Sequence, residues 1–419
     1  AMREGSGYEL VGLAYSFRRL PEAAGFKPRP ADERIGYFTS VRQDWTVDPA
    51  ARETVSRYIQ RWRLEKADAS LELSPPKRPI LFIIEQTVPI RWRRWVKAGI
   101  LEWNEAFEQL GYVDAIEVRQ QTPDNVYASY DPADARYNFV QWTTMGRPFA
   151  LGPRRADPRT GEVLDADIVI DDAFLRAYQY DLEIFGQRTG PWPPTEAEDD
   201  DAGDEAHRDH RPAQGPAAAH ATGLELHASD HANCEHACGL VGQMMLVQAQ
   251  AEAHGRRIPE RLLGQLIKKV VTHEVGHALG LRHNFKASSW LPLEEIKRRR
   301  AETDLPTAAS VMDYAPLLFF AGDDLDEIRH ITDPGIGPYD HWAIEYGYRS
   351  PDGQSLEAML EQIASRSTEP AHAYATDEDT NLFYRPDPYT ATWDHGNSPI
   401  DWARSRIELT DELLEDLRD

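Results

Sequence analysis

Hydrophobic residues in the first half of the chain form short apolar runs around one long helical stripe. Residues 80–84, Ile-Leu-Phe-Ile-Ile, follow a cluster of prolines and predict a buried strand. Apolar residues then recur at steps of three and four over residues 92–110, which predicts one long amphipathic helix that ends at Gly111. Three further apolar runs predict strands, at residues 115–118, 138–142 and 166–170.

The second half of the chain is helical in pattern. Residues 232–253 carry apolar side chains along one side of an expected helix. A second helix is expected to begin at Pro259, because proline is favoured as the first helical residue and an apolar face follows it. Apolar positions over residues 349–419 predict further helices packed on the rest of the chain. The chain is therefore expected to have an α+β fold.

Composition narrows the classes of protein that fit this pattern. With 41% hydrophobic residues, the 419-residue chain can bury a sizeable core, which excludes wholesale disorder. Its net charge of -24 argues against a nucleic-acid binder and against docking on anionic lipid. No stretch approaches the ~18 uninterrupted apolar residues of a membrane span. Two cysteines exclude a disulfide scaffold and a four-thiolate zinc site.

Residues 189–231 break the regular pattern. They include an acidic run from Glu196 to Glu205, followed mainly by Ala, Pro, Gly and His, which is typical of a solvated insertion or a disordered loop. Metal binding by this tract stays open as an alternative, although flexible His-rich loops are usually only solvated. Its histidines are His207, His210, His220, His227 and His231.

The helix expected to begin at Pro259 carries residues that can bind a metal. His273 and His277 are four residues apart, so their imidazoles project from one face and can bind one zinc ion. Glu274 is next to the first histidine, where it can hold and deprotonate a zinc-bound water. Gly280 can turn the chain sharply and bring back His283 as a third ligand. The pattern H-E-x-x-H-x-x-G-x-x-H fixes five positions, so ordinary helix and loop histidines would match it only by chance.

This motif resembles that of the metzincin clan of zinc endopeptidases. Metzincins also have a methionine-containing turn beneath the metal, and residues 310–314, Ser-Val-Met-Asp-Tyr, are similar to it. The resemblance implies that Met312 forms an apolar floor under the three imidazoles without binding zinc. It also implies that Tyr314 approaches the zinc or stabilises the oxyanion. Taken alone, Met312 would be assigned to the hydrophobic core.

Two further stretches extend the resemblance. Residues 165–170 look like the edge strand that binds substrate in metzincins, and residues 338–347 look like the last helix of their catalytic domain. An ordinary strand and an ordinary surface helix are the alternatives. More broadly, the chain is similar to large bacterial zinc-dependent metalloproteases with a metzincin-like catalytic domain. That similarity implies a twisted mixed sheet, an active-site helix and a Met-turn.

Three parts of the chain are therefore expected. Residues 1–78 form an extended N-terminal flanking segment, and residues 79–348 form the metzincin-like catalytic domain that contains the acidic, His-rich insertion 189–231. Residues 349–419 form a helical C-terminal extension. The N-terminus lacks the apolar core of a signal peptide and opens in a strand-like pattern. We therefore expect the chain to come from a longer precursor that is secreted or periplasmic.

The function predicted from these residues is that of a zinc-dependent endopeptidase acting on a protein or peptide substrate, with Glu274 as the base. Two alternatives stay open: a binding module that keeps zinc only for folding, and a zinc amidase that acts on cell-wall peptides. The intact Glu274 disfavours the binding module, because a structural zinc site has no use for that carboxylate.

A structural calcium ion is a further possibility at residues 323–326, Asp-Asp-Leu-Asp. This stretch lacks the ligand spacing of an EF-hand loop, and a solvated acidic turn is the simpler interpretation. The oligomeric state cannot be predicted from these patterns.

Overall fold

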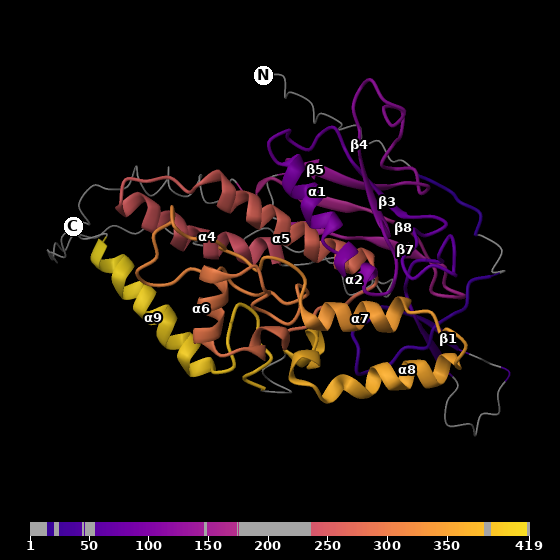
Figure 1. Cartoon of the computed structure of the whole chain (residues 1–419). Coiled ribbons are helices and arrows are strands. Elements are labelled where there is room, and N and C mark those ends of the chain that lie inside the picture. The colour runs from indigo at the N-terminus through magenta and orange to yellow at the C-terminus, as the bar shows by residue number, and fades with distance from the viewer. Residues whose placement is uncertain are drawn as a thin grey trace, which may run out of the picture.

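The computed structural model describes residues 15–20, 25–43, 46, 55–145, 149–173, 175, 236–380 and 387–416. The insertion predicted at residues 189–231 lies outside these ranges. Strands of the N-terminal half lie on one side of the molecule and helices of the C-terminal half on the other, which confirms the α+β class (Figure 1). In the described ranges, no helix is both long enough and apolar enough to cross a membrane.

A five-stranded mixed sheet has the strand order β4-β3-β5-β9-β6. These strands are β3 (Ile80–Ile84), β4 (Ile116–Gln120), β5 (Asn138–Thr143), β6 (Ala150–Leu151) and β9 (Ile168–Asp171). Four of them run parallel, and β6 pairs antiparallel with β9. The apolar run in β3 is almost wholly buried between its two neighbours, as a continuous hydrophobic run predicts. The mixed sheet expected from the resemblance is confirmed.

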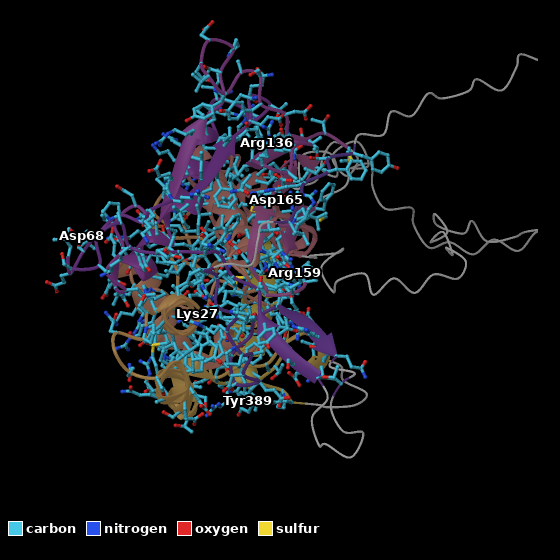
Figure 2. The ribbon with its side chains drawn as sticks, turned by 90° about the vertical axis from the view of Figure 1, so that its right-hand side faces the viewer. Lys27, Asp68, Arg136, Arg159, Asp165 and Tyr389 are labelled. Carbon is cyan, nitrogen blue, oxygen red and sulfur yellow. The ribbon has the colours of Figure 1, made fainter. Side chains whose placement is uncertain are left out.

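Residues 165–170 do not form the edge strand of this sheet, so that prediction is wrong. The first two belong to β8 (Val163–Ala166), which pairs with β7 (Arg154–Ala156) in a separate two-stranded sheet. The rest belong to β9, which pairs with both β5 and β6 and is therefore interior. Two-residue β6 takes the edge position and is too short to give a periodic signal. Figure 2 shows Asp165 of β8 between Arg136 and Arg159 on one side of the molecule.

The helix predicted over residues 92–110 is in fact two helices, α1 (Arg93–Leu101) and α2 (Asn104–Glu108). Trp103 lies between them, fully buried, and its indole Nε1 donates to the Thr272 carbonyl at 2.9 Å. The apolar face is therefore continuous in sequence although the helix is not. The break therefore coincides with a tertiary contact that the local pattern does not contain.

The helix predicted to begin at Pro259 is α5 (Glu260–Ala278), and it packs lengthwise against α1. Gly280 ends its last turn at φ +105, a backbone conformation that favours glycine. A Cβ at this position would lie 2.0 Å from the Gln60 carbonyl oxygen. The sharp turn expected at Gly280 is thus present, and the N-terminal segment closes over it.

Among the described residues, five more helices form the helical side: α4 (His236–Ala253), α6 (Leu293–Glu302), α7 (Pro338–Tyr348), α8 (Leu356–Ala364) and α9 (Pro399–Asp416). Between them lie short 3₁₀ helices at Ala287–Trp290, Ser365–Thr368, Pro370–His372 and Asp377–Asp379. In Figure 1, α9 lies beside α4 at the end of the molecule away from the sheet, and α8 lies below α7. The helices predicted near residues 232–253, 338–347 and 349–419 are all found.

The N-terminal segment contributes a hairpin of β1 (Thr39–Gln43) and β2 (Val55–Ile59). Just before it, the Phe38 N–H donates to the Gly280 carbonyl at 2.8 Å, beside the end of α5. One buried hydrophobic cluster joins Ile35, Phe82 and Leu409, so all three expected parts of the chain share a core. The boundaries drawn at residues 78 and 348 stay a prediction.

Candidate metal centre

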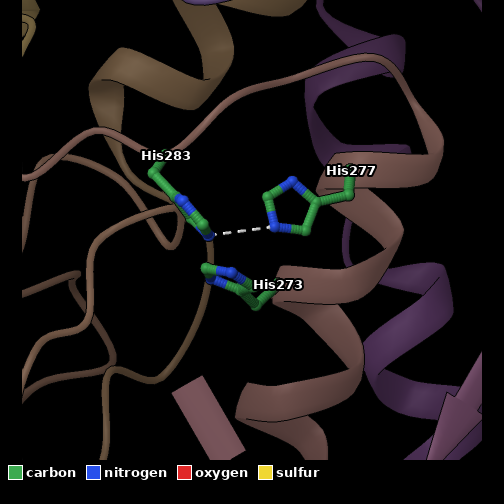
Figure 3. A group of neighbouring side chains, drawn as sticks. All are labelled: His273, His277 and His283. Atoms are coloured by element: carbon green, nitrogen blue, oxygen red, sulfur yellow. Dashed lines mark hydrogen bonds between the residues drawn. The ribbon is translucent and has the colours of Figure 1, made fainter. Parts of the chain in front are cut away.

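Three histidines converge at the end of α5. His273 and His277 project from successive turns of the helix, and His283 faces them from the chain that follows Gly280 (Figure 3). One ring nitrogen of each lies within 4.8 Å of the others, and all three residues are buried. The two Nε2 atoms of His277 and His283 are 3.2 Å apart. The spacing of the sequence motif therefore becomes a cluster in space.

Hydrogen bonds fix the two helical rings. Nδ1 of His273 lies 2.8 Å from the Val311 carbonyl oxygen, and Nδ1 of His277 lies 2.9 Å from the Leu281 carbonyl oxygen. Because a carbonyl oxygen only accepts, both Nδ1 atoms must carry the proton and donate it. Each Nε2 then has the lone pair that a metal requires.

The third ring is held by a carboxylate. Nδ1 of His283 donates to Oδ1 of Asp377 at 2.8 Å, across 94 residues of sequence. Burial raises the pKa of Asp377, but its hydrogen bonds with His283 and Thr376 and the nearby Arg282 help to lower the pKa below its usual value. Asp377 therefore stays a carboxylate and keeps His283 in the same Nδ1-protonated form as the other two.

These residues fit a zinc ion. Burial lowers the pKa of His273 and His277 well below 6.5, so both rings are neutral, as metal ligands must be. The 3.2 Å contact between Nε2 of His277 and Nε2 of His283 joins two acceptors, an arrangement that a shared cation would stabilise. Three neutral imidazoles are the ligand set of many catalytic zinc sites, which keep one further position for water or substrate.

Glu274 follows His273 on α5 and is fully buried. The chain leaving β6 approaches it closely, because a Cβ on Gly152 would lie 2.7 Å from the Glu274 carbonyl oxygen and 3.3 Å from Oε2. Only glycine fits this approach without a shift of the neighbouring atoms. The edge strand and the carboxylate are therefore adjacent.

Residues 310–314, the segment predicted to lie under the metal, are adjacent to α5. Met312 is fully buried, and a Cβ on Gly276 would lie 2.2 Å from its sulfur. Met312 thus packs against the helix backbone between Glu274 and His277. The Tyr314 hydroxyl donates to Nε2 of His283 at 3.1 Å, which places it at the three-histidine cluster.

Helix α7 anchors this segment. One oxygen of the buried Asp340 carboxyl accepts from the Val311 N–H at 2.9 Å and from the Gly337 N–H at 2.8 Å. Its other oxygen accepts from the Ser310 hydroxyl at 2.6 Å. Because the Val311 carbonyl in turn accepts from His273, a continuous chain of contacts joins α7 to a ring of the three-histidine cluster.

Two residues of this centre were not identified from the sequence. Asp377 comes from the C-terminal extension, and His236, the first residue of α4, has its ring 4.4 Å from that of His273 between centroids. Neither has a local spacing to a motif residue, so no sequence signal was available for either.

The acidic stretch at residues 323–326 has a different environment. Asp323 pairs with Arg300 at 2.7 Å, and Asp324 pairs with Arg256 at 2.5 Å. Within the described ranges, the three histidines form the single group of at least three His, Cys, Asp or Glu residues spaced to hold a metal. The structure therefore gives no support for calcium at this stretch.

Comparison with known proteins agrees with this geometry. Residues 255–419 match a family model described as Met-zincin, and residues 4–67 match a family model described as a domain of unknown function. No curated protein and no solved structure matches the chain. The Met-zincin match contains α5, the three histidines and the whole C-terminal extension.

Proposed function

We propose that this chain, which carries a Met-zincin domain over residues 255–419, is a zinc-dependent endopeptidase. The family match and the three-histidine cluster together support a zinc metalloprotease in general. One observation carries the finer proposal: three imidazoles converge with their Nδ1 atoms held by hydrogen bonds, and a buried acidic residue, Glu274, lies on the helix that carries two of them.

His273, His277 and His283 would hold the zinc through their Nε2 atoms. When bound, zinc acts as a Lewis acid on a carbonyl oxygen and lowers the pKa of its water ligand towards ~7. The carbonyls of Val311 and Leu281 keep two of the rings from turning away from the ion.

Glu274 is the proposed general base. Its carboxylate takes a proton from the attacking water and later passes that proton to the leaving amine. The surrounding burial excludes bulk water, so the proton stays on the carboxylate between the two steps. A purely structural zinc site would gain nothing from a carboxylate at this position.

Tyr314 and Met312 have supporting roles in this proposal. The Tyr314 hydroxyl, now 3.1 Å from His283, is proposed to donate to the carbonyl oxygen of the substrate as negative charge develops there. Met312 is proposed to be the Met-turn residue, an apolar support for the histidines that does not bind the metal.

The substrate backbone is proposed to pair with β6. Among the described residues, β6 is one of the two edge strands of the sheet, so its second side has no strand partner. An extended peptide can add to such an edge through backbone hydrogen bonds. The contact of Gly152 with Glu274 would then bring the scissile bond to the base.

We further propose that the full-length precursor is secreted or periplasmic.

The test is to incubate zinc-loaded protein with a mixed peptide library and, separately, with peptidoglycan. Internal cuts in peptides that a chelator stops would support the endopeptidase. Release of wall fragments without peptide cleavage would favour an amidase, and no cleavage of either substrate would favour a binding module.

The Glu274→Gln variant tests the mechanism. We expect it to retain one zinc per chain, because the three imidazoles are unchanged, and to lose at least about 100-fold in kcat, because no base remains. Zinc content is measured by elemental analysis and turnover with a peptide that the wild type cleaves. A variant that cleaves at the wild-type rate would remove Glu274 from the mechanism.

A further inference from the structure

Among the described residues, the buried imidazole of His236 finds none of the hydrogen bonds that such a group normally makes. His236 is the first residue of α4, its exposed fraction is 0%, and within the described part of the chain neither Nδ1 nor Nε2 has a hydrogen-bond partner. Buried polar groups in folded proteins are almost always paired, and each exception calls for a specific explanation. One recurring explanation is a ligand or substrate atom that completes the bonding.

Its neighbours are residues of the metal centre. The ring of His236 lies 4.4 Å from that of His273 and is stacked on that of Tyr314, with centroids 5.2 Å apart and planes 3° apart. His236 therefore contacts both a proposed zinc ligand and the proposed donor to the substrate carbonyl.

Trp393 packs against both His236 and Tyr314. Its ring stacks on His236 at 6.0 Å and lies so close to α4 that a Cβ on Gly239 would be 1.9 Å from it. Trp393 also has φ 65, a left-handed conformation that a bulky residue rarely adopts, and its N–H donates to the Tyr314 carbonyl at 3.0 Å. Strained backbone of this kind persists where the surrounding structure enforces it, often at functional sites.

His236 is not placed as a fourth metal ligand. The ring nitrogens that gather within 4.8 Å are those of His273, His277 and His283, and His236 is outside that group of described residues. A neutral imidazole has one N–H to donate and one nitrogen to accept, so it can serve as a hydrogen-bond donor that keeps its proton.

We infer that His236 is a further catalytic residue, whose ring N–H donates to the scissile carbonyl oxygen together with the Tyr314 hydroxyl. This rests on the proposed function. As the water oxygen bonds to the carbonyl carbon, Glu274 takes its proton and the carbonyl electron pair moves onto the oxygen that His236 and Tyr314 contact. When the C–N bond breaks, the pair returns to form the carbonyl and the amine takes the proton from Glu274.

The experiment compares three variants with the wild type. His236→Phe keeps a ring that can stack on Tyr314 but removes both nitrogens, and His236→Gln restores an N–H donor. His372→Phe is the matched control, because His372 is also a buried ring, stacked on Trp342. Each protein is measured for kcat and KM on a cleaved peptide, and for affinity for a phosphinic peptide, whose tetrahedral anion mimics the charged intermediate. The affinity for cobalt and the visible spectrum of the cobalt-loaded protein are also recorded.

We expect His236→Phe to lower kcat by roughly 100-fold, as loss of one donor to a developing oxyanion does, with KM within about threefold. Affinity for the phosphinic peptide should fall in parallel, His236→Gln should recover part of both losses, and His372→Phe should match the wild type. Cobalt affinity and spectrum should be unchanged, and thermal unfolding should show His236→Phe to be no less stable, since it buries no unpaired nitrogen.

Three results would overturn the inference. Unchanged kcat and phosphinic-peptide affinity in His236→Phe would make His236 merely structural. A changed cobalt spectrum with weaker cobalt binding would make it a metal ligand. Failure of the wild type to cleave any peptide would remove the proposed function, and this inference with it. If His236→Phe did not fold, the same measurements on His236→Gln would decide. Wild-type stability with a lower kcat and a weaker phosphinic complex would support a donor that glutamine replaces poorly, and wild-type kcat and phosphinic affinity would overturn the inference.

Discussion

Each histidine of the metal centre is oriented by a different stretch of chain. His277 donates to a carbonyl in its own turn, at Leu281, whereas His273 donates to Val311, 38 residues away. His283 depends on Asp377, which is the one charged acceptor of the three. A carboxylate fixes the ring and also raises the basicity of the opposite nitrogen, so this contact should contribute most to metal affinity.

Replacing Asp377 with Asn should therefore weaken zinc binding by about 10- to 100-fold while leaving the fold intact. The amide can still accept from Nδ1 of His283, but it lacks the charge that makes Nε2 a stronger ligand. Competition against a chelator of known zinc affinity measures the change. Glu378→Gln is the matched control, because Glu378 is the next residue and pairs with Arg282, as Asp377 also does, but has no contact with His283 among those described. Equal zinc affinity in the two variants would contradict the role assigned to Asp377.

The sequence predicted the three-histidine cluster because the spacing of its residues is local. Three histidines and Glu274 fall within eleven positions, and the helix and turn that bring them together are coded in the same stretch. Asp377 and His236 reach the centre only through the packing of α4 and the C-terminal extension. An aspartate 94 residues away has no periodicity or spacing that separates it from the many other acidic residues of this chain.

Helices and strands, like the site residues, were predicted where their signals are local in sequence. Helix α5 was predicted from end to end because Pro259, its apolar face and Gly280 are all local signals. The break between α1 and α2 was missed because it coincides with a tertiary contact of Trp103 with α5 that the local pattern does not contain. Strand β6 was missed because two residues give no alternation, and the role of edge strand was therefore assigned to its longer neighbour β9.

Helix α7 gives a prediction at the scale of elements, through its buried Asp340. Burial raises the pKa of this carboxyl to about 7, against about 3.9 in an unfolded chain. Between these values the folded protein keeps the proton and the unfolded chain loses it. The resulting stabilisation is therefore complete below about pH 4 and is lost as pH rises through about 7, at a total of a few kcal/mol.

Asp340→Asn should remove this decline, because an amide does not ionise. Its oxygen can still accept from the Val311 and Gly337 N–H groups, which both donate to one oxygen of Asp340. Between pH 4 and pH 8, the free energy of unfolding of the variant should therefore rise relative to that of the wild type. Urea unfolding of metal-free protein at a series of pH values measures the free energy of unfolding of the variant and of the wild type. The contribution of the buried histidines to the pH dependence is the same in both proteins and cancels in the difference. Parallel curves would show that Asp340 does not titrate in this range.

At the scale of the whole molecule, the C-terminal extension is part of the metal centre rather than an addition to it. The segment that follows His283 forms backbone hydrogen bonds with the C-terminal extension. The Phe285 N–H donates to the Ala375 carbonyl at 2.8 Å, and the Gly396 N–H donates to the Ser288 carbonyl at 3.0 Å. The Met-zincin match over residues 255–419 includes this region as well. The N-terminal segment closes the other side, where Phe38 bonds to Gly280. A common core and the metal centre are thus built from segments that are distant in sequence.

A chain that ends at Tyr348 should therefore lose both zinc affinity and cooperative unfolding. The cut removes Asp377 and a set of buried apolar side chains worth together roughly 10 kcal/mol, which is comparable with the whole stability of a typical domain. These side chains are Met359, Leu360, Ile363, Leu409 and Leu413. Thermal unfolding followed by circular dichroism and zinc competition measure the two losses. Adding residues 349–419 as a separate chain should restore part of each, because the contacts are non-covalent, whereas a truncated chain with wild-type zinc affinity and a sharp transition would show that the extension is dispensable.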